Sequence, residues 1–439
     1  MKTNATLIMF ALLILTGAAW FAVFNNITGD AGAFQDHCRE GDILAAKGIY
    51  IDAVKSYEKA LSLNPKDYGL AMKIADAYKK LSDTNGFLQA CDKAIKIDPT
   101  QDEPYVLKAE HYLSRSMYAE ARGVLADSKK VKDATRLDAI AEALQSKYFE
   151  KYVSLDAIGD WRIQGKIDYV PACDKGQWGM AAGDGTRKIK YMYDYLGAYS
   201  EIEEVIPCCY EGEYYYIDIK GNRKLVGDRD YEFLGSFGDG YAPAQYDGIY
   251  GYINTKFQEQ KFEYDYAGAF ANGVAAVKKG EKWALIDKSF KEITGFEYDD
   301  ILIDSNGFCS LYSVVVLQQG GAYRFYDVKG KKFSDRSFDE AKPVASPEGA
   351  IAVRFGDLWG FADKTGRLII EPQYEEANSF SLGFAPFRKG ERWGYLNEKN
   401  ETAIEPKFYD AKPFSGEGTA VVRASEKWYF IGLCQYEGN

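Results

Sequence analysis

The stretch GFAPFRKGERWGYLNEKNETAIEPKFYDAKPFSGEG, residues 383–418, contains the unit that about two-thirds of the chain repeats. Three short apolar runs are separated by turns that contain Gly or Asn, and the second run carries Trp393-Gly394. The position of Trp393, here called the aromatic slot, recurs at Trp178, Tyr214, Tyr250, Trp283, Tyr323, Trp359, Trp393 and Trp428. Successive slots are 36, 36, 33, 40, 36, 34 and 35 residues apart. A period of this size predicts an array of supersecondary units rather than one irregular core.

The residues around each slot predict short strands joined by tight turns. Ten residues before the slot there is often a Gly, and an alternating run such as Phe-Ala-Pro-Phe (384–387) follows it, which is typical of a half-buried strand. Seven residues past the slot a turn residue suited to positive φ recurs. It is Gly185, Gly221, Gly330, Gly366 or Asn400. Phe257 and Phe290 occupy this position in two units, where we expect a different turn.

An acidic residue also recurs near the end of each unit, after a Tyr or Phe. Examples are Tyr193-Asp194, Tyr298-Asp299, Phe338-Asp339 and Tyr374-Glu375. An acid repeated in most units is predicted to cap a turn or to lie on a solvated rim. The acid pairs Glu203-Glu204, Asp299-Asp300 and Glu375-Glu376 could instead serve as glycosidase carboxylates, which is the less favoured interpretation.

The paired Trp-Gly resembles the WG-repeat family, which is found in arrays on bacterial proteins. The resemblance spans roughly residues 165–433 and is strongest at Trp178-Gly179, Trp359-Gly360 and Trp393-Gly394. Each slot ring is expected to bury on the order of 200 Å² against the next unit, so the rings hold successive units together. The Gly after the ring, which lacks Cβ, lets a neighbouring backbone or ring come close.

The β domain is predicted to span residues 153–439, as an array of about eight units. Eight first-half hairpins are present, but only seven second halves follow them before Asn439. A closed, propeller-like ring would let the N-terminal segment near Asp156-Ala157 fill the gap and would remove exposed strand edges. We therefore favour a ring over an open β-solenoid. The 40-residue interval contains an enlarged loop, Ile301–Cys309, expected at a functional rim.

Residues 34–152 are predicted to be helical, because apolar residues recur at three- and four-residue spacing and Ala is frequent. Asn64-Pro65 and Asp98-Pro99 end two units 34 residues apart, and a third unit lacks the Pro. This pattern resembles the tetratricopeptide (TPR) family of helix-turn-helix repeats. Residues 134–152 are predicted to form a closing helix. The resemblance places the groove that binds partners, proteins or peptides, at Met72, Asp76, Lys79, Val106 and Glu110.

The run from Thr6 to Phe24 is uncharged and almost wholly apolar. As a helix it would be roughly 28 Å long, close to the ~30 Å hydrocarbon thickness of a bilayer. We expect residues 1–33 to be a signal anchor and linker, with residues 6–24 in the membrane and the body outside the cytoplasm. Secretion after cleavage of a signal peptide is the alternative.

Composition excludes several classes of function. A net charge of −11 argues against nucleic-acid binding, which needs a basic stripe. The seven Cys form no C-x-x-C pair, and the only two His, His37 and His111, fall in the helical region. A catalytic triad or a His-rich metal site is therefore excluded in the β domain, and we expect no catalytic, cofactor-binding or metal site in the chain.

Three functional hypotheses follow. The favoured one is a membrane-anchored, non-enzymatic protein–protein interaction scaffold that combines TPR and WG repeats. The alternative is a module that binds cell-envelope glycan or peptidoglycan through exposed aromatic rings. A hydrolase that uses paired carboxylates is the least favoured.

Overall fold

The computed structural model describes residues 31–161, 169–310, 312–347 and 349–434. It divides the chain into two compact units, one ending at Lys147 and one beginning at Tyr148. The predicted anchor, residues 6–24, lies outside the described residues. From residue 31 onward, no described helix combines the length and apolar character that crossing a bilayer requires.

The first unit is a stack of paired helices. Residues 31–46 are helical. They are followed by α2 (Tyr50–Leu63), α3 (Tyr68–Lys80), α4 (Thr84–Ile97), α5 (Glu103–Leu113), α6 (Tyr118–Asp127) and α7 (Thr135–Gln145). Asp67 and Asp83 cap α3 and α4 by accepting hydrogen bonds from the backbone N–H of Leu70 and Gly86. Small residues let the helices approach closely: a Cβ on Gly86 would lie 2.4 Å from the ring of Tyr78.

The closing helix is shorter than predicted, because α7 ends at Gln145 and a strand, β1 (Tyr148–Leu155), begins three residues later. The expected boundary between the two domains therefore moves from residue 152 to Lys147. The segment YFEKYVSL is rich in aromatic and β-branched residues, and its pairing partner is the last strand of the chain. A partner so distant along the chain cannot be identified from the local sequence.

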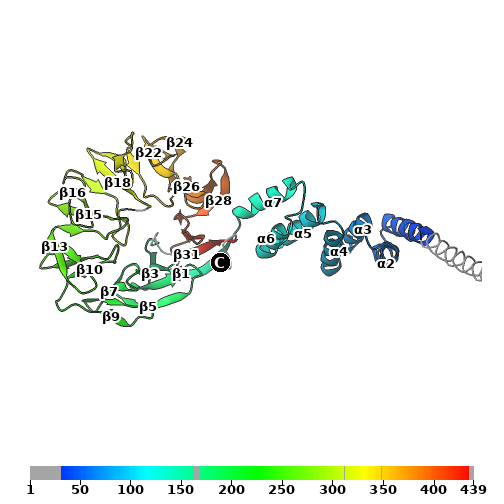
Figure 1. Cartoon of the computed structure of the whole chain (residues 1–439), viewed down its shortest axis with the longest axis horizontal. Helices are drawn as coiled ribbons and strands as arrows, with labels where there is room; N and C mark the ends of the chain where they lie inside the picture. The colour runs from blue at the N-terminus through cyan, green and yellow to red at the C-terminus, as the bar shows by residue number, and fades with distance from the viewer. Residues whose placement is uncertain (1–30, 162–168, 311, 348, 435–439) are drawn as a thin grey trace, which may run out of the picture. The chain divides into compact units, whose positions relative to one another are not determined.

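The second unit consists of eight antiparallel sheets, here called blades 1 to 8, arranged around a ring (Figure 1). Blade 1 contains β2 (Ala157–Ile158), β3 (Tyr169–Asp174), β4 (Gln177–Ala182) and β5 (Arg187–Tyr193), and blade 2 contains β6 (Tyr195–Leu196), β7 (Ile206–Tyr210), β8 (Glu213–Ile217) and β9 (Arg223–Leu225). Blade 3 contains β10 (Phe233–Leu234), β11 (Ala242–Tyr246), β12 (Ile249–Ile253) and β13 (Glu259–Tyr264). Blade 4 contains β14 (Tyr266–Ala267), β15 (Val274–Lys279) and β16 (Lys282–Asp287).

Blades 5 to 8 continue the same order. Blade 5 contains β17 (Asp300–Ile301), β18 (Val314–Gln319), β19 (Ala322–Asp327) and β20 (Lys332–Phe333), and blade 6 contains β21 (Glu340–Ala341), β22 (Ile351–Phe355), β23 (Leu358–Ala362) and β24 (Leu368–Tyr374). Blade 7 contains β25 (Glu376–Ala377), β26 (Phe384–Lys389), β27 (Arg392–Asn397) and β28 (Thr402–Phe408). Blade 8 contains β29 (Asp410–Ala411), β30 (Thr419–Arg423) and β31 (Trp428–Leu433), and β1 completes it. Each blade begins with a two-residue strand near the axis, and its last strand lies toward the periphery (Figure 1).

The ring closes through β1, which pairs antiparallel with β31 and supplies the outer strand of blade 8. Tyr148 lies opposite Leu433 and Glu150 opposite Ile431, and Figure 1 shows the two strands side by side. The prediction that an N-terminal segment fills the missing half-unit is confirmed, and the arrangement is a propeller-like ring rather than an open solenoid. Because β1 pairs with β31, the outer edge of β31 is covered where the ring closes.

The Gly after the aromatic slot lies at a bulge. In blade 7 the register between β27 and β28 shifts across Gly394, between Trp393 and Tyr395, and again between Tyr395 and Leu396. A Cβ added to Gly394 would lie 2.3 Å from the carbonyl oxygen of Ile404, and one on Gly360 would lie 2.6 Å from that of Ile370. The close approach predicted for this Gly is therefore made by the backbone of the next strand in the same blade.

The expectation of a different turn at Phe257 and Phe290 is wrong. Their φ values are +54° and +59°, so both adopt the left-handed conformation that Gly366 adopts in its unit. In each unit the preceding Asn254 or Asp287 accepts two backbone N–H hydrogen bonds. The cost of about 1–2 kcal/mol for this conformation is offset by aromatic packing. The Phe290 ring lies 5.0 Å from that of Tyr241.

Candidate functional site

The eight slot aromatics hold neighbouring blades together, as predicted. Trp359 and Trp393 are 4% and 6% exposed and pack against apolar residues of the blade that follows. Tyr214 lies 5.9 Å from Phe233 of the next blade, and Tyr250 lies 5.5 Å from Tyr266. The remaining slots also join clusters with residues of the following blade: Trp178, Trp283, Tyr323 and Trp428. These rings therefore form an inter-blade core.

The repeated acids are turn caps, as predicted. Asp265, Asp299 and Asp339 each accept a hydrogen bond from the backbone N–H of a turn glycine in the following hairpin, at 2.6–2.7 Å. Glu375 makes the same contact with Gly390 at 3.3 Å. In the described part of the chain, no group of three or more His, Cys, Asp or Glu side chains is placed to hold a metal ion.

The ring is asymmetric at its axis. The residue directly after each two-residue strand faces the axis, and its backbone N–H bonds to the neighbouring strand in every blade. Blades 1 to 4 place glycine there, and blades 5 to 8 place larger residues: Gly159, Gly197, Gly235 and Gly268, then Leu302, Lys342, Asn378 and Lys412. One half of the axis thus carries no axial side chains, and the other carries those of one leucine, one asparagine and two lysines.

The enlarged loop of blade 5 fills the glycine half. Ser305 and Asp160 of blade 1 bond reciprocally: the Asp160 N–H donates to Ser305 Oγ at 2.7 Å, and the Ser305 N–H donates to Asp160 Oδ2 at 2.9 Å. Asn306 Nδ2 donates to the Asp160 carbonyl at 3.0 Å. On the other side, the Ala269 N–H of blade 4 donates to the Gly307 carbonyl at 2.7 Å. The loop therefore bridges the inside of the ring.

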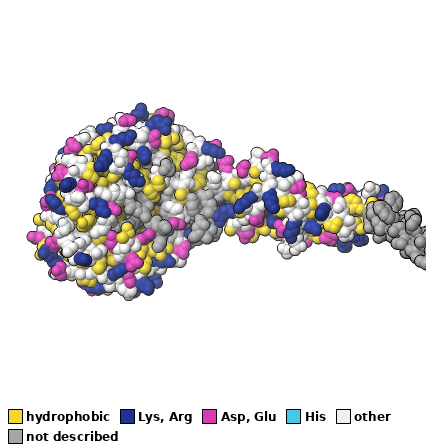
Figure 2. All heavy atoms as spheres, viewed as in Figure 1, with side chains coloured by type: hydrophobic (Ala, Val, Ile, Leu, Met, Phe, Trp, Pro, Cys, Tyr) yellow, Lys and Arg dark blue, Asp and Glu magenta, His cyan; other side chains and the backbone are white. Residues whose placement is uncertain are grey.

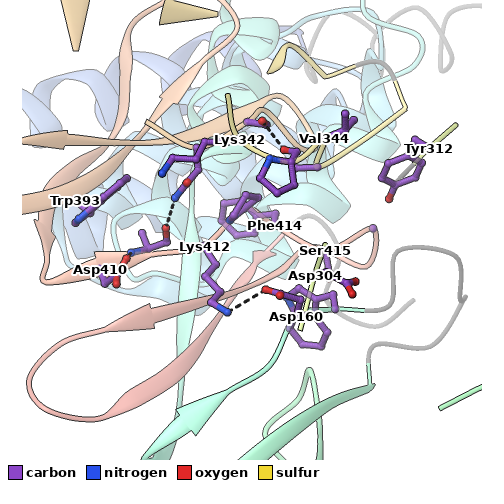
Figure 3. Close-up of a pocket in the computed structure, with 18 of the residues that line it drawn as sticks. Asp160, Asp304, Tyr312, Lys342, Val344, Trp393, Asp410, Lys412, Phe414 and Ser415 are labelled. Carbon is purple, nitrogen blue, oxygen red and sulfur yellow. Dashed lines mark hydrogen bonds and ion pairs between the residues drawn. The ribbon is translucent and has the colours of Figure 1, made fainter. Parts of the chain in front are cut away.

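The other half of the axis remains open as a cavity of about 480 Å³, here called the axial cavity (Figure 3). Its walls come from the segments that follow the short strands of blades 1, 5, 6, 7 and 8, with two slot rings at the border. The residues that the argument uses are Asp160, Trp161, Asp304, Tyr312, Lys342, Glu376, Trp393, Asp410, Lys412, Phe414, Glu417 and Trp428. Aromatic rings and charged groups therefore line the same cavity.

Hydrogen bonds from the axial residues link blades 6, 7, 8 and 1 in turn. Ser379 Oγ donates to the Pro343 carbonyl at 2.7 Å, and Asn378 Nδ2 donates to the Ala411 carbonyl at 3.1 Å. Lys412 Nζ donates to Asp160 Oδ1 at 3.1 Å and to the Ile158 carbonyl at 3.2 Å. Figure 3 shows the Lys412 side chain reaching toward Asp160. The polar wall of the cavity is therefore held in place by its own contacts.

Two carboxyl groups at this wall, Asp160 and Asp304, have pKa values that are shifted in opposite directions. Burial acts to raise the pKa of Asp160, but Lys412 and the hydrogen bonds from Ser305 outweigh it, so the pKa of Asp160 is lowered. Burial, and then the charge of Asp160, raise the pKa of Asp304 to about 7. The first carboxyl is ionised at neutral pH, and the second is poised to gain or lose a proton there.

The helical unit has a hollow of about 280 Å³ on its first repeats. Met72 and Asp76, two predicted groove residues, lie in its wall with Tyr50, Tyr57 and Lys73. Lys73 Nζ lies 2.6 Å from Asp42 Oδ1, and the Tyr57 hydroxyl donates to the same oxygen at 2.8 Å. A charged and aromatic edge therefore borders an apolar floor.

The other three predicted groove residues lie elsewhere. Lys79 and Glu110 are exposed, but neither lines the hollow. Val106 is only 5% exposed, because it packs with Tyr105, Ala109 and Val124 between helices. Its assignment as a ligand-facing residue is therefore wrong.

Sequence reasoning missed the axial cavity. Residues such as Asp160, Asp304 and Lys412 stand outside the repeated motif, and their meeting depends on ring closure. One signal was present: aligned on the short strands, the axial position changes from Gly in the first four units to Lys, Asn and Lys in the last three. A break in a repeated pattern marks positions that packing alone does not determine.

Together, helical repeats followed by an eight-bladed ring define a protein built from two kinds of repeat. The model of the WG containing repeat matches residues 250–283, 359–393 and 393–428, and the tetratricopeptide repeat model matches residues 37–67 and 68–101. The chain is a WG-repeat protein with N-terminal TPR repeats.

Solved structures share limited similarity with the chain. The TPR2B domain–pHsp70 complex of yeast Sti1 is 24% identical over 25% of this chain and 91% of that chain, with a TM-score of 0.22. The Sgt2 TPR domain from Aspergillus fumigatus is 18% identical over 25% and 77%, with a TM-score of 0.21. A eukaryotic initiation factor is 11% identical over 62% and 83%, with a TM-score of 0.39.

Proposed function

We propose that this protein is a non-enzymatic protein–protein interaction scaffold, tethered to a membrane by residues 6–24, with its body outside the cytoplasm. The chain contains two types of repeat, and the repeats of each type stack into an array. Such arrays present extended surfaces to partners, which supports the proposal. The observation that carries it is the hollow of the helical unit, where Met72 and Asp76 lie together with Tyr50 and Tyr57.

The hollow suits a segment of a partner peptide. Met72 has an unbranched, polarisable side chain that adapts to different apolar groups. The exposed carboxylate of Asp76 can accept a hydrogen bond from a peptide amide or from a basic side chain. Lys73 is engaged by Asp42 at 2.6 Å, so it is less available to an acidic ligand. We infer an extended peptide with an apolar side chain next to a basic or amide group.

Proximity labelling in intact cells tests the scaffold. The substitution Met72→Glu places a charge in the apolar floor, and Lys80→Ala, at an exposed position of the same helix, is the matched control. We expect one set of partners to be recovered with the wild type and with Lys80→Ala, and to be lost with Met72→Glu. Recovery of the same set with Met72→Glu, or of none with the wild type, would reject the proposal.

Membrane tethering is tested separately. The full-length chain should resist extraction of membranes with alkaline carbonate, and trypsin added to intact cells should remove the body. A chain without residues 1–30 should be found in the soluble fraction. Release of the full-length chain by carbonate, or protection of the body from trypsin, would reject the tether or its orientation.

The glycan-binding alternative loses its original basis, because the slot rings are packed between blades rather than exposed. Sedimentation of residues 148–439 with purified cell wall is the direct comparison. Retention of this fragment would favour glycan binding over a purely protein-directed scaffold.

A further inference from the structure

Both lysines of the axial cavity already have acidic partners. Lys412 Nζ lies 3.1 Å from Asp160 Oδ1. Lys342 Nζ lies 3.8 Å from Glu376 Oε1 and 4.0 Å from Glu340 Oε1, and 4.7 Å from the centre of the Trp359 ring. An anionic ligand would have to compete with these contacts. The two lysines therefore do not make the cavity an anion site.

Three acidic side chains that line the cavity form no ion pair among the described residues. Among the described residues, Asp304, Asp410 and Glu417 have no basic group within 4.0 Å, although Arg423 faces Asp410 across the strand pair. Asp304 and Glu417 thus leave an excess of negative charge in a cavity whose two lysines are paired. Figure 3 shows Asp304 beside Ser415, on the same side of the cavity as Asp160.

Asp304 also lacks a hydrogen-bond donor on one oxygen. Its Oδ1 accepts the N–H of Asn306 at 2.9 Å and that of Phe308 at 2.8 Å. Its Oδ2 is buried and has no partner within the part of the chain that the structure describes. A buried acceptor without a donor costs about 1–3 kcal/mol. A positive charge in the cavity would stabilise the ionised form of this carboxyl electrostatically.

Aromatic rings complete the site. Trp161, Tyr312, Phe414 and Trp428 border the same cavity as Asp304. The faces of such rings attract cations within about 6 Å of their centres. Carboxylates with aromatic rings suit an organic cation better than a hydrated metal ion, for which the described residues offer no cluster of ligands.

We propose that the axial cavity binds a primary ammonium group, with Asp304 as its counter-ion and the rings of Trp161, Tyr312 and Phe414 around it. Two sources carry this chemistry: a lysine side chain of a peptide, and an amino sugar with a free amine. The site belongs to the ring and is independent of the hollow in the helical unit, so either can fail without the other.

The proposal predicts that binding tightens as pH rises through neutrality. Asp304 must be ionised to pair with an ammonium group, and burial and Asp160 hold its pKa at about 7. The other groups that act on it do not titrate there. Lys412 keeps the pKa of Asp160 low, burial raises those of Tyr266 and Cys309 to about 12, and that of Tyr195 lies higher still. Binding should therefore release a proton below pH 7.

Isothermal titration calorimetry of the full-length chain tests the site. The probes are Nα-acetyl-lysine amide and glucosamine, each with a neutral analogue, Nα-acetyl-norleucine amide and N-acetylglucosamine. The test variant is Asp304→Asn, which keeps Oδ1 as acceptor for the loop. The control is Asp287→Asn, whose Oδ1 accepts the N–H groups of Ser289 and Lys291 in the same pattern at an outer turn.

We expect at least one amine probe to bind the wild type and Asp287→Asn equally, and Asp304→Asn about tenfold more weakly or worse. The affinity of the wild type for Nα-acetyl-lysine amide, whose side-chain amine stays protonated in this range, should rise about tenfold between pH 6 and pH 8. The tighter of the two amine probes identifies the source of the ammonium group. Three results would overturn the proposal: no binding of either amine, equal binding of the neutral analogues, or a flat pH profile in the wild type. The pH profile does not depend on the variant folding.

Discussion

Three buried tyrosines link neighbouring blades through the same kind of hydrogen bond. The hydroxyls of Tyr216, Tyr252 and Tyr395 donate to the carbonyls of Gly235, Gly268 and Lys412 at 2.9–3.0 Å, in each case the axial residue of the next blade. All three rings are 0% exposed. Each tyrosine thus satisfies a carbonyl that lies next to the axis.

Tyr395→Phe should destabilise the ring. The substitution keeps the ring but leaves the Lys412 carbonyl without this donor, at a cost of about 1–2 kcal/mol. Urea denaturation followed by circular dichroism measures the change. Tyr409→Phe, at a side chain that is 44% exposed, is the control and should be neutral. An equal effect of the two substitutions would mean that the hydroxyl of Tyr395 contributes nothing.

Asp410 is one methylene too short for the ion pair that its counterparts make. In blades 6 and 7, Arg354 Nε lies 3.0 Å from Glu340 and Arg388 Nε lies 3.1 Å from Glu376. In blade 8 the buried Nε of Arg423 has no partner among the described residues. Asp410→Glu should restore the pair and stabilise the ring by about 0.5–1 kcal/mol. A lower urea midpoint than that of the wild type would contradict this account.

At the scale of the element, the Trp-Gly pair combines two separate requirements. The ring packs toward the next blade, whereas the Gly admits the next strand of its own blade. The sequence alone predicts both roles in outline, because each repeats at a fixed offset. It does not predict the bulge, since the register shift arises from how β27 and β28 meet.

Gly394→Ala should therefore be costly. The new methyl group would lie 2.3 Å from the Ile404 carbonyl oxygen, so the bulge would have to open, at a cost of about 1–3 kcal/mol. Gly295→Ala, where a Cβ meets no atom within 4 Å, is the control and should not lower stability. Thermal unfolding of both variants provides the comparison. A Gly394→Ala variant as stable as the control would show that the bulge relaxes freely.

At the scale of the whole molecule, ring closure depends on β1. A fragment of residues 148–439 contains β1 and every other described strand of the eight blades, whereas residues 156–439 leave blade 8 without its outer strand. The longer fragment should unfold cooperatively, and the shorter one should melt earlier and associate through the open edge of β31. Calorimetry and sedimentation velocity distinguish them. Equal melting temperatures would show that β1 is dispensable.

Asp304 should make stability depend on pH. Its pKa is raised above the unfolded value of about 3.8, so the folded state holds the proton more tightly. This contribution is fully present below pH 4 and is lost as pH rises toward 7. Asp304→Asn removes it, so the stability of the variant relative to the wild type should rise between pH 4 and pH 7 and then level off. A constant difference across this range would mean that the carboxyl titrates normally.

Prediction from sequence succeeded for most signals that repeat, the turns at Phe257 and Phe290 excepted, and failed where a contact occurs once. The slots, turns and caps recur, so their roles follow from comparing units. The strand nature of residues 148–155 and the meeting of Asp160 with Ser305 are single events between segments distant along the chain. Val106 shows the same limit, since its burial depends on helix packing in one atypical repeat.

The closure strand has a consequence for biosynthesis. β1 leaves the ribosome before the 278 residues that separate Leu155 from Leu433 have been made. At about 5–20 residues per second, that interval lasts roughly 14–56 s. Throughout this time β1 remains unpaired in the nascent chain, and seven blades are made before β1 can pair with β31. Cells that slow translation or lack chaperones for such edges should therefore accumulate the open form of this protein first.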